Sequence, residues 1–183
     1  MTDYYFDVET TGLNPFENKL LTVQLKRGND IVIWKLWEEE NELDLIEKLL
    51  DRLGNISKSN SIYGYNCLKF DVPFVASRLT LNGALDGRSY TALYDRNWVD
   101  LYQFLGGSYV SMDRWLSFYG IKRDCPFRGS HVPSLFAEKR FVEIEEHAAE
   151  DVVLCEKLVE KLRSDHSAWR ASASTLALAE EMS

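Results

Sequence analysis

Two carboxylates stand two positions apart in an apolar segment near the start of the chain. Residues 3–9 are rich in aromatic and β-branched side chains, which is typical of a β-strand, and they include Asp7 and Glu9. Because side chains two apart share one face of a strand, both carboxylates face the same side of the sheet. Two adjacent like charges on a core-forming strand are unfavourable unless water or a cation compensates them. The segment is therefore either an edge strand with a solvated face or part of a site that binds a cation.

The rest of the chain alternates between strand and helix patterns. A Gly-Asn-Asp hairpin signal at 28–30 joins two of the strands, so the first three strands are expected to form an antiparallel meander. This order predicts an α/β fold in which helices cover the faces of a mixed sheet. The predicted elements are strands over 20–26, 31–37 and 61–65, helices over 40–53, 71–81, 112–119 and 142–162, a loop over 84–97, and a strand or short helix over 98–104.

Composition narrows the class of protein. The length of 183 residues suits one domain, and the net charge of −8 argues against a non-specific nucleic-acid binder with a basic face. An enzyme whose carboxylates hold divalent cations remains compatible with this charge. The isolated cysteines Cys67, Cys125 and Cys155 have neither a zinc-site spacing nor a disulfide pattern.

The chain shows no targeting pattern. It has no apolar run of about 20 residues, and its first residues lack the features of a secretory signal, so we expect a cytoplasmic location without a membrane segment. Residues 164–183 are rich in Ser and Ala and are predicted to form a peripheral helix or a partly ordered tail.

Four further residues attract attention, and each also has an ordinary explanation. Asp71 stands where a helix with Pro in its first turn begins, so it is a candidate N-cap. His147 and Asp151 are four apart and share one face of the last predicted helix, where a solvated acidic surface is the alternative. Asp100 lies in apolar surroundings and is interpreted as structural or as support for a site.

The order and neighbourhoods of these residues resemble a known family. Phe6-Asp7-Val8-Glu9-Thr10-Thr11-Gly12-Leu13 resembles the first motif of the DEDD superfamily of 3′→5′ exonucleases, which have a ribonuclease H-like fold. Tyr65-Asn66 with Phe70-Asp71-Val72-Pro73-Phe74 resembles the second motif, and residues 147–152 resemble the third. The stretch 129–152 is further similar to exonuclease domains related to the proofreading domain of family B DNA polymerases. The resemblance covers about residues 1–163, which we take as an exonuclease-like domain.

The resemblance implies a fold and a reaction. The fold is a five-stranded mixed sheet with Asp7 and Glu9 on its central first strand. The reaction is the hydrolysis of single-stranded DNA from its 3′ end to nucleoside 5′-monophosphates, by a two-metal-ion mechanism. The implied metal ligands, for two Mg²⁺ or Mn²⁺ ions, are Asp7, Glu9, Asp71 and Asp151. His147 is implied to orient the attacking water or to accept its proton. The implied contacts to the terminal nucleotide are Thr10, Gly12, Leu13, Asn66 and Phe70.

One departure from the family pattern leaves alternatives open. The tyrosine branch has Tyr four residues before the last Asp, and the histidine branch usually has His five before it, whereas here His147 lies four before Asp151. The alternatives are an exoribonuclease with the same site, a catalytically weak binding module, and a proofreading subunit of a polymerase or repair complex. The candidate phosphate contacts are Arg78, Arg88, Arg96 and Arg128.

Overall fold

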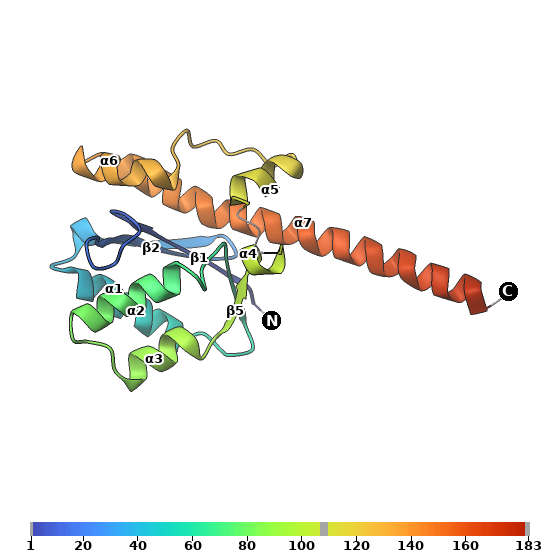
Figure 1. Ribbon diagram of the computed structural model, residues 1–183, viewed down its shortest axis with the longest axis horizontal. Coiled ribbons are helices and arrows are strands. Elements are labelled where there is room, and N and C mark those ends of the chain that lie inside the picture. The colour runs from blue at the N-terminus through green and yellow to red at the C-terminus, as the bar shows by residue number, and fades with distance from the viewer. Residues whose placement is uncertain (1, 107–109, 182–183) are drawn as a thin grey trace.

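A five-stranded mixed sheet forms the centre of the protein (Figure 1). This computed structural model describes residues 2–106 and 110–181, with side chains to residue 165. The strand order is β3-β2-β1-β4-β5; β1 pairs antiparallel with β2 and parallel with β4, β2 and β3 are antiparallel, and β4 and β5 are parallel. The strands are β1 (Tyr4–Thr10), β2 (Leu20–Arg27), β3 (Asp30–Lys35), β4 (Ser61–Gly64) and β5 (Asn97–Asp100). The predicted sheet is confirmed. The edge-strand interpretation of Asp7 and Glu9 is wrong, because β1 is central.

Helices cover both faces of the sheet. Figure 1 shows α1, α2 and α3 on one side and α5, α6 and α7 on the other. The helices are α1 (Glu42–Gly54), α2 (Asp71–Leu81), α3 (Gly87–Tyr94), α4 (Leu101–Phe104), α5 (Met112–Phe118), α6 (Val132–Ala137) and α7 (Phe141–Glu181), with single 3-10 turns at Leu36–Glu38 and Gly129–His131.

The loop predicted over 84–97 is wrong, because this stretch contains α3 and the start of β5. Asp86 caps α3 by accepting a hydrogen bond from the backbone N–H of Ser89 at 2.8 Å, and the Ser89 hydroxyl lies 2.8 Å from the Asp86 backbone nitrogen. Burial of Ala92 and Leu93 then anchors the helix. Eight residues are too few for helical periodicity to stand out, so the cap was the stronger signal.

The side chains on the two faces of β1 differ in character. Tyr4, Phe6 and Val8 belong to the large apolar core beneath α1 and α2. On the opposite face, Tyr5 joins the apolar core formed with α7, and Asp7 and Glu9 continue the same row. The alternation of strand side chains therefore separates an apolar face that stabilises the sheet from a face that presents carboxylates toward α7.

The last helix is longer than the prediction for 142–162. It continues as one element to Glu181, and Figure 1 shows its C-terminal part extending beyond the sheet. The division of the chain at residue 163 stays a prediction. In the described part of the chain, every helix is too short or too polar to span a bilayer.

Candidate functional site

Four carboxylates from three elements meet at one cleft. Asp7 and Glu9 come from β1, Asp71 from the first residue of α2, and Asp151 from α7. All four line a cleft of about 410 Å³. Residues far apart in sequence thus converge at the end of the central strand.

Backbone and side-chain hydrogen bonds orient two of these carboxylates. Asp71 Oδ1 accepts a hydrogen bond from the backbone N–H of Val8 at 3.1 Å, which ties the start of α2 to β1. The predicted N-cap role of Asp71 is wrong: the N-cap position belongs to Phe70, and the Asp71 side chain turns to the strand instead. Asp7 Oδ2 accepts a hydrogen bond at 2.6 Å from the side-chain amide of Gln24, which stands opposite Asp7 on β2.

Burial and neighbouring negative charges raise the pKa of three of these carboxylates. Burial raises the pKa of Asp7 well above its ordinary value, and the charges of Asp71, Glu9 and Asp151 act in the same direction. Burial and the charges of Asp151 and Asp71 likewise raise the pKa of Glu9. Burial raises the pKa of Asp71 to about 7, against the effect of its backbone hydrogen bonds. Such a cluster binds protons in the absence of another cation, and its oxygen donors suit hard divalent ions.

His147 lies behind the carboxylates. It is 1% exposed and lines an adjoining pocket of about 260 Å³ that shares Asp7 and Asp151 with the main cleft. Its Nε2 is 3.3 Å from Glu9 Oε1 and 3.6 Å from Asp151 Oδ2. Burial lowers the pKa of His147. The neutral imidazole is therefore favoured, and this form can accept a proton or bind a metal ion.

The donor set fits divalent cations. Glu9, His147 and Asp151 each offer one atom to a group whose members lie within 4.8 Å of one another. Asp7 and Asp71 line the main cleft and offer further carboxylate oxygens. Buried carboxylates with raised pKa values, together with a buried imidazole, are the environment that a bound cation would stabilise.

Arg123 is the site residue that sequence reasoning missed. Its Nη1 forms an ion pair with Asp151 Oδ1 and lies 3.2 Å from Glu150 Oε2, and its Nε lies 3.0 Å from Asp113 Oδ1. The side chain is only 8% exposed. A single arginine in the polar stretch Lys122-Arg123-Asp124 carries no periodic or motif signal, so only the folded chain reveals its position.

The predicted nucleotide contacts all reach the main cleft, which is lined by Thr10, Gly12, Leu13, Asn66 and Phe70. The Thr10 hydroxyl donates a hydrogen bond to the Gly12 carbonyl at 2.8 Å and shapes the turn. A side chain at Gly12 would require Asn18 to move, because a Cβ there would lie 2.5 Å from Asn18 Oδ1. Leu13 is 80% exposed beside this turn. An exposed leucine at a cleft is available for a ligand.

All four candidate phosphate contacts have partners within the protein, and three of them line neither the main cleft nor the pocket beside His147. Arg78 pairs with Glu42, Arg88 with Asp51, and Arg96 donates to backbone carbonyl groups. Arg128 lines the pocket beside His147, where it pairs with Asp113 at 2.8 Å. Arg128 is therefore the candidate at the site.

Asp100 has the structural role. It is buried and accepts hydrogen bonds from the backbone N–H groups of Asn66, Leu68 and Tyr102 at 2.8, 3.1 and 3.0 Å. It thereby caps α4 and holds the segment that precedes Asp71.

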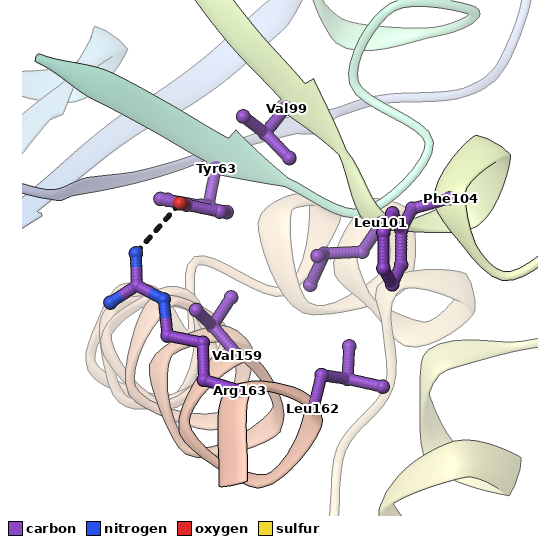
Figure 2. A pocket seen from close by; sticks show the side chains of 7 residues that line it. All are labelled: Tyr63, Val99, Leu101, Phe104, Val159, Leu162 and Arg163. Atoms are coloured by element: carbon purple, nitrogen blue, oxygen red, sulfur yellow. Dashed lines mark hydrogen bonds between the residues drawn. The ribbon is translucent and has the colours of Figure 1, made fainter. Parts of the chain in front are cut away.

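A separate, mainly apolar pocket of about 220 Å³ lies where α7 meets β4, β5 and α4 (Figure 2). Arg163 closes one side by donating a hydrogen bond to the Tyr63 hydroxyl at 2.7 Å. Its lining includes no carboxylate and no residue of the main cleft. It is therefore distinct from the carboxylate site.

Comparisons with known proteins agree with this fold. A family described as the RNase_H superfamily matches residues 4–163. The structure is similar to a family B DNA polymerase from the hyperthermophilic archaeon Pyrobaculum calidifontis, with a TM-score of 0.72 and 18% sequence identity. The match covers 88% of this chain and 24% of the polymerase, and at this identity it concerns the fold. No curated protein matches the sequence.

Proposed function

Because the chain belongs to the RNase H superfamily, we propose that it is a 3′→5′ exonuclease acting on single-stranded DNA. The products are nucleoside 5′-monophosphates, and the reaction depends on two Mg²⁺ or Mn²⁺ ions. One observation carries the proposal: Asp7, Glu9, Asp71 and Asp151 converge from three elements on one cleft.

The residues of the chain divide the work. Asp7, Glu9, Asp71 and Asp151 hold the ions, and the bonds from Gln24 to Asp7 and from Val8 to Asp71 keep two carboxylates in place before metal binds. Bound divalent ions would supply an activated water and stabilise the leaving 3′-oxygen. His147 lies beside Glu9 and Asp151, where its neutral imidazole can orient the attacking water or accept a proton from it.

The cleft suits the end of a single strand. Its volume of about 410 Å³ is comparable to sites that enclose small ligands, roughly 300–1,000 Å³. Leu13 and Phe70 offer apolar surface to the terminal base, and Thr10, Gly12 and Asn66 complete the wall. Apolar and stacking contacts of this kind tolerate any base and require an unpaired one.

Two alternatives use the same site. An exoribonuclease would use the same residues with a preference for RNA. Among the described side chains, none is identified as a contact to a 2′-hydroxyl that would distinguish RNA from DNA. A catalytically weak module could bind ends for a polymerase or repair complex; the polymerase-like fold is compatible with a proofreading role in trans. A cytoplasmic location belongs to the same proposal.

Matched 5′-labelled DNA and RNA oligonucleotides of one sequence test the proposal. Each is incubated with the full chain in Mg²⁺, in Mn²⁺ and in EDTA, and the released products are separated by chromatography. We expect DNA to shorten and nucleoside 5′-monophosphates to appear with either metal only. Faster loss of RNA would select the exoribonuclease, and two intact oligonucleotides would select the binding module.

A further inference from the structure

His147 is buried without satisfying its polar atoms. Among the residues whose side chains are described, neither Nδ1 nor Nε2 has a hydrogen-bond partner, although the ring is 1% exposed. The approach of Nε2 to Glu9 Oε1, at 3.3 Å, lacks hydrogen-bond geometry. Leaving a buried polar atom unpaired destabilises the folded state, so an orphaned imidazole indicates a missing partner.

The neighbours of Nε2 are spaced like ligands of one ion. Nε2 lies 3.3 Å from Glu9 Oε1 and 3.6 Å from Asp151 Oδ2, and the three atoms form one compact group. Ligand bonds of about 2.0–2.2 Å place adjacent donor atoms roughly 3.0–3.6 Å apart in octahedral or tetrahedral geometry. The site therefore needs little rearrangement to bind an ion.

Arg123 limits which oxygen of Asp151 is available. Its guanidinium forms an ion pair with Oδ1, whereas Oδ2 is the atom directed to His147. Gly129 closes the other side: a Cβ there would lie 3.8 Å from Glu9 Oε2 and 4.0 Å from His147 Nε2. His147 and Asp151 both line the adjoining pocket of about 260 Å³.

We propose that His147 Nε2, Glu9 Oε1 and Asp151 Oδ2 bind one divalent transition-metal ion, and that this nitrogen ligand makes the site prefer Mn²⁺ to Mg²⁺. This inference rests on the proposed function in one respect: the ion is taken to be one of those that the carboxylate cleft holds. Mg²⁺ favours an all-oxygen shell, whereas imidazole binds first-row transition ions well. This assignment replaces the role of orienting or deprotonating water that the proposed function gives to His147, because Nε2 cannot accept a proton while it binds the ion.

Mn²⁺ binding to the full chain tests the inference without any reaction. Protein labelled with 15N-histidine is loaded with Mn²⁺, and pulsed electron paramagnetic resonance measures the coupling between the ion and histidine nitrogen. Competition with Mg²⁺ measures selectivity. We compare the wild type with H147N, whose side chain is too short to reach the ion, and with H147Y.

H131N is the matched control. His131 lies outside the group, and its Nδ1 accepts a hydrogen bond from the Arg128 backbone N–H, which an asparagine oxygen can replace. Circular dichroism and thermal unfolding in EDTA establish that each variant is folded.

The expected result is a histidine coupling in the wild type and in H131N that is absent in H147N and H147Y. The Mn²⁺ affinity of H147N should fall by at least about tenfold, the lower end of what even an outer ligand costs, with a smaller change for Mg²⁺. No histidine coupling in the wild type, or equal losses for the two ions, overturns the inference.

The two proposals fail separately. Intact oligonucleotides together with a His147-dependent Mn²⁺ site would refute the exonuclease and retain the metal site. Degraded oligonucleotides together with unchanged metal selectivity in H147N would do the reverse.

Discussion

The guanidinium of Arg123 is bound to the carboxylate of Asp151, which the cleft presents beside Asp7 and Glu9. Arg123 also contacts Glu150 and Asp113, so one cation is shared among three carboxylates. The metal-free protein thus already neutralises part of its acidic site. The remaining negative charge is what divalent ions would neutralise.

Removing Arg123 should destabilise the metal-free protein. We expect R123M to lower the free energy of unfolding by about 2–4 kcal/mol in EDTA, because loss of one partner leaves a nearly buried carboxylate uncompensated. The stabilisation produced by Mn²⁺ should be larger than in the wild type, since the ion replaces the lost charge. Urea unfolding with and without Mn²⁺ measures both effects. R88M is the control, because the Arg88–Asp51 pair is exposed and should contribute little; equal losses in the two variants would contradict the assignment.

Neutralising Asp7 should raise the stability of the metal-free protein and abolish its nuclease activity. D7N removes the cost of burying the Asp7 carboxylate and its repulsion by Asp71, Glu9 and Asp151, so we expect the free energy of unfolding in EDTA to rise. Nuclease activity should disappear because an ion loses its ligand. D30N changes an exposed carboxylate at the start of β3 and should alter neither quantity. Wild-type digestion by D7N would rule out the carboxylate site.

The metal-free protein should lose stability as the pH rises from about 4 to about 7. Burial raises the pKa of Asp71 to about 7 in the folded state, while the unfolded group titrates near its ordinary value of about 3.9. Between these values the unfolded chain has released a proton that the folded chain retains, so the free energy of unfolding decreases with pH. Below about 4 the group contributes nothing, and above about 7 the loss is complete.

The difference between wild type and D71N isolates this effect. In EDTA, the free energy of unfolding of the wild type minus that of D71N should decrease by on the order of 2–4 kcal/mol between pH 4 and pH 7.5. The amide that D71N introduces has an oxygen that can still accept the hydrogen bond from the backbone N–H of Val8. A difference that stays constant over this range would show that Asp71 is already ionised in the folded protein.

Leu13 should contribute to substrate binding alone. Because it is 80% exposed, L13A should leave the free energy of unfolding within about 0.5 kcal/mol of the wild type. The KM for a DNA oligonucleotide should rise several-fold, since the cleft loses apolar surface for the terminal base. F16A provides the comparison: Phe16 is 75% exposed near the same turn but does not line the cleft. Equal KM values for L13A and F16A would remove Leu13 from the substrate contacts.

The sequence predicted the parts of the fold that depend on local pattern. Strand alternation placed Asp7 and Glu9 on one face, and helical spacing placed His147 and Asp151 on one side of α7, because each relation spans only a few residues. The bond from Val8 to Asp71 joins residues 63 positions apart, and the pair of Arg123 with Asp151 spans 28. Such partners are selected by tertiary packing, so neither the strand-facing side chain of Asp71 nor the position of Arg123 could be predicted.

The most direct test of the account follows one oligonucleotide from both ends. A single-stranded DNA 20-mer labelled at its 5′ end, and the same oligomer labelled at its 3′ end, are incubated in Mn²⁺ with wild type or D7N. The account predicts a ladder of shortening 5′-labelled products and immediate release of the 3′ label as mononucleotide, with neither in D7N or EDTA. Intact oligomers, internal cuts without stepwise products, or equal digestion by D7N would contradict it.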